Sequence, residues 1–427
     1  MSEYRKRIAD ALLSRKLAGV GAVLVEGAKW CGKTTTCEQF AKSALYMADP
    51  QKRESLLQYA KVDISRLLEG DRPRLIDEWQ DVPQFWDAIR AYVDHAEGDG
   101  HFILTGSSVV PKDKEDKIVH SGTGRIARVK MRPMSLWESG ESSGEVSLAA
   151  LFSGTEFVSA RAKECSLDDI SYVICRGGWP RAVEQGGDTA LDRAFDYFES
   201  VVESDISRTD GIPRDPDRVR QLMRSYARQQ GTQSKLSTIR KDMLANDARG
   251  LEEDTIRSYL GALRRIFVVE DLKAWCPSLR AKDAIRTSDT RYFTDPSIAV
   301  AALGITPGEL MNDIRSFGYF FEALAIRDLR VYAEALMGHV EHYHDGTGLE
   351  CDAVVHLRNG EYGLVEIKLG GGLAEDGVTT LRTFDQLIAR KRFKPPAFRM
   401  VLTATGDLAY RRPEDGIVVC PITALRP

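Results

Sequence analysis

The feature that most constrains what this chain can fold into is the segment 27–34, which reads Gly-Ala-Lys-Trp-Cys-Gly-Lys-Thr. It fits the phosphate-binding loop template, in which a glycine and four further residues precede Gly-Lys-Ser/Thr. The apolar run 21–26 before it predicts a short buried strand, and residues 35–43 after it predict a helix. A glycine-rich turn in this position aims backbone N–H groups and the positive end of a helix dipole at phosphate. The sequence therefore predicts that the chain binds ATP or GTP.

Two side chains of this loop have specific predicted roles. Lys33 is expected to reach the β- and γ-phosphates, and the Thr34 hydroxyl is expected to ligate Mg²⁺. The alternative is a turn that merely caps a helix, but the strand before it and the helix after it favour the phosphate loop. The predicted nucleotide-binding residues are Gly27, Ala28, Lys29, Trp30, Cys31, Gly32, Lys33, Thr34 and Thr35.

A second segment, 72–80, predicts a buried strand that ends in two acids, Asp77 and Glu78. Asp77 is expected to hold Mg²⁺, usually through water, and Glu78 to orient or deprotonate the attacking water. An apolar run followed by acids can also be a strand that enters a helix cap. Its position roughly 45 residues after a phosphate loop favours the interpretation as a nucleotide hydrolase.

The segment 101–108 predicts another buried strand that ends in small polar residues. Because ligands of a doubly wound sheet bind at the carboxyl ends of its strands, Thr105 or Ser107 is expected to face the γ-phosphate. The alternative is a strand that leaves the sheet through a Gly-Ser turn.

Cations surround a short predicted strand in the segment 122–133. An arginine that reaches the γ-phosphate of a neighbouring subunit can stabilise transition-state charge, and Arg125 is the first candidate, with Arg128 second. A solvated strand edge with alternating charge explains either residue equally well.

Length and composition limit the classes of protein to which the chain can belong. At about 150 residues per domain, 427 residues predict two or three domains, and a charged fraction of 29% is typical of a soluble globular protein. The net charge of −4 neither demands nor excludes nucleic acid. Seven scattered cysteines without a Cys-x-x-Cys pair argue against a zinc knuckle or a disulfide framework. We expect a cytoplasmic protein, because neither a secretory segment nor an apolar membrane span is apparent.

These motifs together resemble a widespread prokaryotic family that joins an AAA+ type ATPase module to a C-terminal domain of unknown function. The resemblance lies in segments 27–34, 75–80, 104–108, 124–125 and 132–138, and it covers essentially the whole chain. It implies an AAA+ like core. One departure is Trp30-Cys31, where relatives more often carry Arg-Gln, but these positions contribute mainly backbone N–H groups.

The middle of the chain resembles a winged helix. Segments 236–244 and 253–266 predict two short helices, and segments 267–272 and 291–294 predict an apolar strand pair. A helix that reads DNA brings its N-terminal end close to phosphates, whereas this one begins with Glu252, Glu253 and Asp254. Packing or subunit contact is therefore favoured over major-groove reading, which stays open.

The C-terminal part carries a second group of candidate residues. A helix that begins near residue 316 bears Glu322, and Asp352 lies in the second of three predicted strands. Glu366 and Lys368 are two residues apart in the third strand, so both point to one face. This pattern resembles the restriction-endonuclease, or PD-(D/E)XK, fold.

The resemblance implies metal-assisted hydrolysis of a phosphodiester in this part of the chain. Asp352 and Glu366 would ligate Mg²⁺, Lys368 would steady the attacking hydroxide, and Glu322 would assist as a further ligand. One alternative is a simple Glu–Lys ion pair on a half-exposed strand. Another is an inactive domain that only binds nucleic acid.

We therefore expect a multidomain α/β protein. Residues 1–161 would form a P-loop AAA+ like domain on a parallel sheet, 162–303 a helical lid and winged-helix-like segment, and 304–427 a small restriction-endonuclease-like domain. Its expected function is binding and hydrolysis of ATP with Mg²⁺, coupled to binding or cleavage of DNA or RNA. The alternative is a nucleotide-controlled switch or scaffold whose C-terminal domain binds a partner without cutting. An arginine acting in trans would require a homo-oligomer, and no membrane partner is expected.

Overall fold

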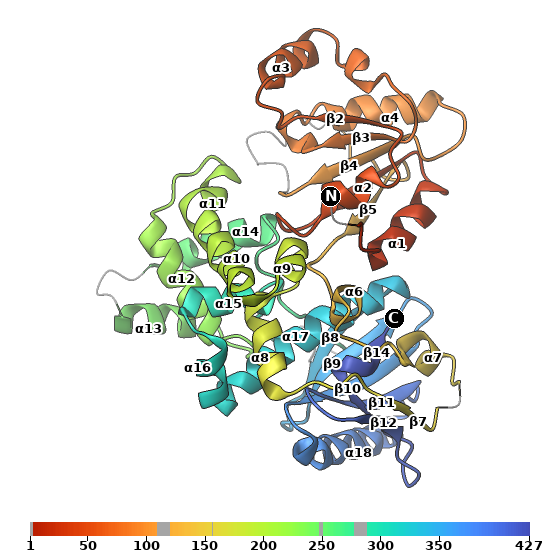
Figure 1. Ribbon diagram of the computed structural model, residues 1–427, viewed down its shortest axis with the longest axis vertical. Helices are drawn as coiled ribbons and strands as arrows, with labels where there is room; N and C mark the ends of the chain where they lie inside the picture. The colour runs from red at the N-terminus through yellow and green to blue at the C-terminus, as the bar shows by residue number, and fades with distance from the viewer. Residues whose placement is uncertain (1–2, 109–119, 156, 247–250, 277–287) are drawn as a thin grey trace. The chain divides into compact units, whose positions relative to one another are not determined.

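The computed structural model (Figure 1) describes residues 3–108, 120–155, 157–246, 251–276 and 288–427. The chain forms two compact units, each assembled from three segments. The first unit consists of Met1–Pro133, Ser200–Pro216 and Ser258–Val268, and the second of Met134–Glu199, Asp217–Arg257 and Val269–Pro427. No helix among the described residues is long and apolar enough to cross a membrane.

The first unit is built on a five-stranded sheet whose pairings are all parallel, as predicted. Its strands are β1 (Ala22–Glu26), β2 (Ser43–Tyr46), β3 (Arg74–Asp77), β4 (Phe102–Gly106) and β5 (Ile126–Lys130). Their order is β2-β3-β4-β1-β5, so β4 lies between β1 and β3. All five carboxyl ends therefore lie at one edge of the sheet, where such sheets bind their ligands.

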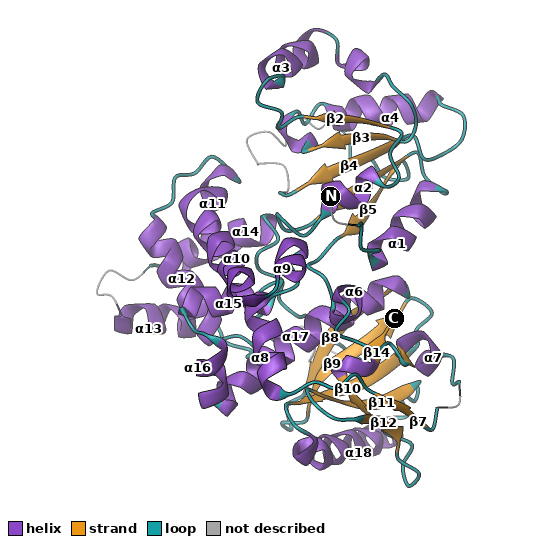
Figure 2. Cartoon of the chain, viewed as in Figure 1, coloured by secondary structure: helices purple, strands orange, loops and turns teal. Residues whose placement is uncertain are grey.

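Helices cover this sheet, as Figure 2 shows. Those that pack on it are α1 (Ile8–Leu17), α2 (Lys33–Glu38) and α4 (Phe85–His95), and the first unit also contains α3 (Arg53–Val62) and α11 (Ile206–Arg208). The core between the sheet and α4 includes Leu24, Leu104, Phe85 and Ile89, all of them buried. Each such side chain contributes about 1.5–3 kcal/mol on burial, which makes the sheet a firm base for the loops at its edge.

The second unit is built on a seven-stranded mixed sheet. Its strands run in the order β7-β12-β13-β11-β10-β9-β8. They are β7 (Ser159–Arg161), β8 (Gly338–His344), β9 (Glu350–Leu357), β10 (Tyr362–Lys368), β11 (Phe398–Thr403), β12 (Leu408–Arg411) and β13 (Val418–Pro421). The long helix α17 (Ile314–Ala335) packs on β8, β9 and β10, and α18 (Ala374–Lys391) packs on β10 and β11. A separate pair joins β6 (Val146–Ser147) to β14 (Leu425–Arg426).

Shorter helices make up the rest of the second unit. They are α6 (Leu136–Ser139), α7 (Leu148–Phe152), α8 (Leu167–Arg176), α9 (Pro180–Gln185), α10 (Gly187–Ser200), α12 (Pro216–Arg228), α13 (Leu236–Asn246), α15 (Pro296–Leu303) and α16 (Pro307–Asn312). Helix α14 (Glu253–Arg265) begins in the second unit and ends in the first.

The domain boundaries predicted at residues 161 and 303 differ from those of the structure. Residues 134–161 belong to the second unit, because β7 pairs with β12 and β6 pairs with β14. The predicted middle domain 162–303 is divided between the two units rather than folding by itself.

The winged-helix prediction is reproduced only in its helices. Helices α13 and α14 form where expected, and α14 buries Ile256, Leu260 and Leu263. The expected strand pair is reduced to two isolated antiparallel bridges, Val269 with Phe293 and Leu272 with Thr290. A wing made of full strands is absent from the described residues 267–276 and 288–294.

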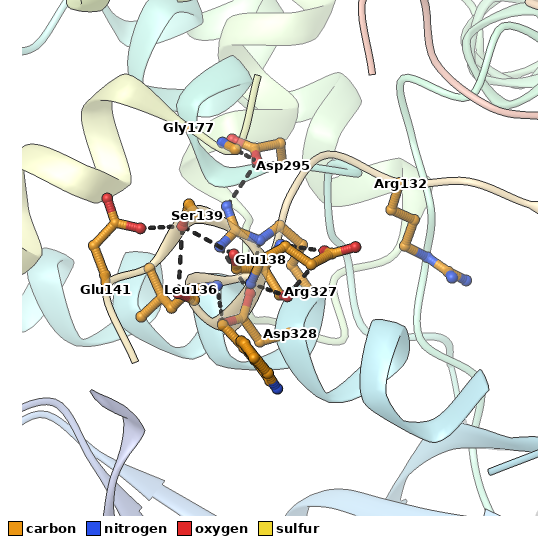
Figure 3. Close-up of polar contacts among 12 residues, drawn as sticks. Arg132, Leu136, Glu138, Ser139, Glu141, Gly177, Asp295, Arg327 and Asp328 are labelled. Carbon is orange, nitrogen blue, oxygen red and sulfur yellow. Dashed lines mark hydrogen bonds and ion pairs between the residues drawn. The ribbon is translucent and has the colours of Figure 1, made fainter. Parts of the chain in front are cut away.

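A buried charge network ties together four segments of the second unit (Figure 3). The Arg327 guanidinium donates to Asp295 Oδ2 at 2.9 Å and to Asp328 Oδ1 at 2.7 Å. Asp328 Oδ2 accepts from the backbone N–H of Leu136 at 2.9 Å, and Asp295 Oδ2 accepts from that of Gly178 at 3.0 Å. The network therefore anchors the Met-Ser-Leu-Trp-Glu segment 134–138 onto α17.

Candidate nucleotide-binding site

The predicted phosphate loop connects β1 to α2, as its sequence requires. A side chain at Gly27 would place its Cβ 2.0 Å from the Met131 carbonyl, so only glycine fits there. Gly32 has a φ of 98° and precedes the first turn of α2. The Lys33 ammonium is buried and donates at 2.9 Å to the carbonyls of both Gly27 and Ala28. The loop thus curls around the ammonium group that is expected to meet phosphate.

Asp77 connects three of the predicted residues. Its Oδ1 atom accepts from the Thr34 hydroxyl at 2.7 Å and from the Thr105 hydroxyl at 2.6 Å. The sheet order explains this convergence, because β4 places Thr105 between the ends of β1 and β3. The carboxylate is almost fully buried, so its two hydroxyl donors offset the loss of water.

Glu78 lies next to this cluster in a left-handed conformation with a φ of 55°. Its backbone N–H donates to Thr105 Oγ1 at 3.2 Å, and its Oε2 atom accepts from Ser107 Oγ at 2.9 Å. The side-chain amide of Gln80 donates to the same carboxylate oxygen. A non-glycine residue held at positive φ is strained and persists where its surroundings fix it, which here aims the carboxylate.

The residues of this site fit a magnesium–nucleotide complex. The Thr34 hydroxyl and the Asp77 carboxylate lie within hydrogen-bond distance of each other. Both supply the hard oxygen ligands that Mg²⁺ prefers. The glycine at position 27 keeps the loop free of a side chain, and the buried Lys33 ammonium already binds two carbonyl oxygens of the loop. Phosphate oxygens can replace those carbonyls as acceptors.

The predicted carboxylates of the second unit also come together. Lys368 Nζ lies 2.8 Å from Glu366 Oε2 and 3.5 Å from Asp352 Oδ2. The backbone N–H of Ile367 donates to Asp352 Oδ2 at 2.7 Å. Glu322 accepts a hydrogen bond from the hydroxyl of Tyr292. Strands β9 and β10 and helix α17 therefore place all four predicted side chains in one region.

Burial and charge alter the protonation of this group. Burial, together with the charge of Asp352, raises the pKa of Glu366 to about 8 and that of Glu322 well above its ordinary value. Within the described part of the chain, no set of three His, Cys, Asp or Glu side chains is placed to hold a metal ion. The metal role of Asp352, Glu366 and Glu322 stays a prediction, and the Lys368 ammonium pairs with two of these carboxylates.

The segment that contains the phosphate loop matches a known protein family. Residues 20–139 match the family described as AAA domain. This segment is an AAA+ ATPase domain. Residues 167–309 match Domain of unknown function (DUF8612), and residues 317–425 match Domain of unknown function (DUF4143). No curated protein sequence matches the chain.

Two solved structures show distant likeness. The Aeropyrum pernix ORC2 protein in its ADP form is 13% identical, over 63% of this chain and 87% of that chain, with a TM-score of 0.29. A Signal Transduction ATPase with Numerous Domains (STAND) protein with a tetratricopeptide repeat sensor from Pyrococcus horikoshii is 12% identical, over 79% of this chain and 54% of that chain, with a TM-score of 0.25. Neither likeness is close enough to extend to binding or activity.

The AAA+ domain holds its phosphate loop with residues that the sequence analysis missed. The Arg7 guanidinium donates at 2.8 Å to the carbonyls of Cys31 and Arg132, which ties the loop to the segment after β5. Lys29 Nζ lies 2.5 Å from Asp205 Oδ1, in the π-helical turn Val201–Asp205. The Lys29 ammonium therefore forms an ion pair with Asp205 of the same unit.

The other predicted loop residues differ in their surroundings. Trp30 is 47% exposed in a left-handed conformation, and the Thr35 side chain is exposed on α2. Cys31 is buried, with Sγ 3.5 Å from the Met131 carbonyl. As expected, the loop therefore offers mainly backbone groups and Lys33.

Arg125 of the AAA+ domain lies far from its own phosphate loop. It precedes β5, which runs parallel to β1, so it sits at the amino ends of the strands, whereas the loop follows the carboxyl end of β1. Its Nε donates to Asp94 Oδ1 at 2.7 Å and lowers the pKa of that carboxyl. The second candidate, Arg128, pairs with Glu26 at 2.9 Å. Neither arginine contacts Asp77 or Glu78.

Proposed function

We propose that this chain hydrolyses ATP with Glu78 as the base and uses the turnover to switch the binding state of its second unit. The observation that supports the first part best is the shared contact of the Thr34 and Thr105 hydroxyls with Asp77 Oδ1. It joins the phosphate loop, the acidic strand end and the intervening strand in one buried cluster. Such an arrangement suits a reaction that depends on positioning and charge stabilisation.

Each residue of the cluster has a distinct task in this proposal. Lys33 exchanges its two loop carbonyls for β- and γ-phosphate oxygens, and Thr34 and Asp77 hold Mg²⁺. When bound, Mg²⁺ neutralises charge that develops on the phosphates. The Glu78 carboxylate accepts a proton from the attacking water, and its hydrogen bonds from Ser107 and Gln80 hold it in position.

We further propose that Arg125 acts on ATP bound to a second copy of the chain. The side chain is about half exposed, and its placement at the amino ends of the strands is incompatible with a role in its own site. A positive charge supplied by a neighbour typically increases phosphoryl-transfer rates about 10³- to 10⁵-fold. Hydrolysis would then require a homo-oligomer.

The ion pairs in the second unit support a partner-binding switch. Lys368 pairs closely with Glu366, at 2.8 Å, and more distantly with Asp352, at 3.5 Å, so a protein cation lies where a nuclease would need its metal. Metal-dependent cleavage of DNA or RNA is a second candidate, favoured by the convergence of the same three side chains. Incubating single- and double-stranded DNA and RNA with Mg²⁺ or Mn²⁺ separates the two. Cleavage abolished by both Lys368→Ala and Glu366→Ala supports the nuclease, and any other result favours the switch.

The hydrolase proposal is tested by two substitutions with matched controls. Lys33→Ala should lose ATP binding, whereas Glu78→Gln should keep binding and lose turnover, because glutamine cannot accept the proton. Lys61→Ala and Glu69→Gln alter exposed residues of the same unit and should behave as the wild type. Equal loss of binding in Lys33→Ala and Glu78→Gln would contradict the assigned roles.

A further inference from the structure

The second unit contains a cavity of about 370 Å³ that the proposed hydrolysis of ATP does not use. Three parts of the chain form its walls: a turn after α12, a segment that precedes α15, and α17 with the adjoining strands β8 and β9. The lining residues are Gly231, Thr232, Gln233, Thr290, Tyr292, Tyr319, Glu322, His342, Tyr343, His344, Glu350, Cys351 and Asp352.

Backbone hydrogen bonds fix the wall that the turn and the segment before α15 form. Gly231 N–H donates to the Arg291 carbonyl, and Arg291 N–H donates to the Thr232 carbonyl, both at 2.9 Å. The side chain of Gln233 bonds His344 Nδ1 at 2.8 Å. Gly231 has a φ of +73°, and a Cβ there would lie 2.8 Å from the Tyr319 ring. A glycine at this position keeps the cavity open.

The described lining of the cavity is acidic. It includes the carboxyl groups of Glu322, Glu350 and Asp352 and no lysine or arginine, although burial raises the pKa of Glu322 above its ordinary value. The ammonium of Lys368, behind Asp352, bonds Glu366 at 2.8 Å and reaches Asp352 only at 3.5 Å. An anionic group such as a nucleotide phosphate would be repelled here, and a cation would be attracted.

Several polar atoms of the wall have no partner among the described residues. Both contacts of Asp352 are made by Oδ2, and Tyr292 donates only to Oε1 of Glu322, so Oδ1 and Oε2 remain acceptors. His342 is 3% exposed, and its buried Nε2 lacks a hydrogen bond. Burial lowers the pKa of His342 to about 4, so this ring adds no positive charge at neutral pH. Among the described lining residues, His342 Nε2 is thus the buried side-chain atom without a partner, and such atoms are rare unless a ligand completes them.

We propose that this cavity binds an organic cation with a primary ammonium or guanidinium group, either a free small molecule or a basic side chain of a partner protein. Carboxylate oxygens on two walls accept charge-assisted hydrogen bonds from such a group. Tyr319 and Tyr343 offer ring surfaces that attract a cation. A bare metal ion fits less well, because the described residues contain no set of three metal-binding side chains. The proposal depends on neither ATP hydrolysis nor nuclease activity.

Calorimetry on the full chain without nucleotide tests this assignment. Agmatine and N-acetyl-arginine amide should bind saturably, and their affinities should fall about tenfold or more in Glu322→Gln and Asp352→Asn. Asp376→Asn, an exposed carboxylate on α18, should bind as the wild type. Tyr319→Ala, at a ring that is 37% exposed, should also weaken binding and replaces either carboxylate variant that fails to fold. Tighter binding of the arginine amide than of agmatine would identify a partner side chain as the source.

Three probes of different charge give the results that would overturn the proposal. N-acetyl-citrulline amide is the neutral match of the arginine probe and should not bind. The cavity would not be a cation site if the neutral probe bound as tightly as the arginine amide, or if thymidine monophosphate bound and the cations did not. It would be a metal site if Mn²⁺ displaced agmatine at concentrations below that of agmatine. No binding of any probe would also refute it.

Discussion

Thr105→Val tests how the cluster around Asp77 works. Valine keeps nearly the same volume at a fully buried position but removes the hydroxyl that donates to Asp77 Oδ1 and accepts from the Glu78 N–H. A hydrogen bond to a charged group contributes about 1.5–3 kcal/mol, and an unpaired buried donor costs about 1–3 kcal/mol. We therefore expect the first unit to lose about 2–4 kcal/mol of unfolding free energy.

The same substitution should impair catalysis more than binding. Lys33 and Thr34 keep their contacts, so the Kd for ATP should change little. Glu78 loses the anchor of its backbone, and a displacement of about 1 Å can lower kcat about 100-fold. Urea unfolding gives the stability of the first unit, whose unfolding transition is the one that added ATP moves to higher urea concentration. Steady-state hydrolysis gives kcat. Thr105→Ser restores the hydroxyl and should recover most of both values.

Two results would refute this reasoning. Wild-type kcat in Thr105→Val would mean that Glu78 does not depend on Thr105 for its position. Equal damage in Thr105→Ser and Thr105→Val would mean that restoring the hydroxyl does not restore function, so the hydrogen bonds of this hydroxyl would not explain the loss in Thr105→Val.

The remaining predictions concern the neighbouring subunit and the buried charge network. Arg125→Ala and Glu78→Gln should each be nearly inactive alone. A mixture of the two should regain hydrolysis, because a site that combines Glu78 of one variant with Arg125 of the other is intact. A mixture as inactive as its components would contradict action in trans. Burial raises the pKa of Asp328 from 3.8 to about 6. The folded state therefore keeps a proton that the unfolded state releases, and the stability this provides is lost as pH rises through about 4 to 6. From about pH 4 to 7, unfolding free energies should shift by about 3 kcal/mol in favour of Asp328→Asn over the wild type. A pH-independent difference between the two proteins would show that Asp328 stays ionised.

The sequence predicted that Thr34, Asp77 and Thr105 would lie together, because the information for this placement is local. The order of strand, loop and helix around residues 27–34 requires the P-loop geometry, and acids at the end of a buried strand must lie at the same sheet edge. Thr105 followed from the same rule. These residues meet in the structure as expected.

The supporting contacts could not be predicted because they join distant parts of the chain. Lys29 and Asp205 are 176 residues apart, and Arg7 reaches the carbonyl of Arg132, 125 residues away. Neither of these two contacts is indicated by a sequence motif or by the periodicity of apolar residues. The contact of Gln80 could have been predicted, because Gln80 lies two residues after Glu78 in a tight turn. Its side-chain amide donates a hydrogen bond to the Glu78 carboxylate.

The error at the domain boundary has a similar cause. Strand β7 has three residues, Ser159–Arg161, with no apolar alternation, and its partner β12 lies far along the chain. A strand this short is defined by its pairing and carries almost no signal of its own. The alternation around Asp352 and Glu366 did predict their strands, but the cavity wall from residues 231–233 depends on tertiary contacts alone.

The Mg²⁺ dependence of ATP affinity tests the central claim most directly, namely that Asp77 and the phosphate loop hold the metal–nucleotide complex together. Calorimetric titrations of the wild type and Asp77→Asn should be run with Mg²⁺ and with EDTA. We predict that Mg²⁺ tightens ATP binding to the wild type but not to Asp77→Asn, and that the two proteins bind metal-free ATP alike. Equal tightening in both proteins, or no heat of binding with millimolar ATP and Mg²⁺, would contradict the account.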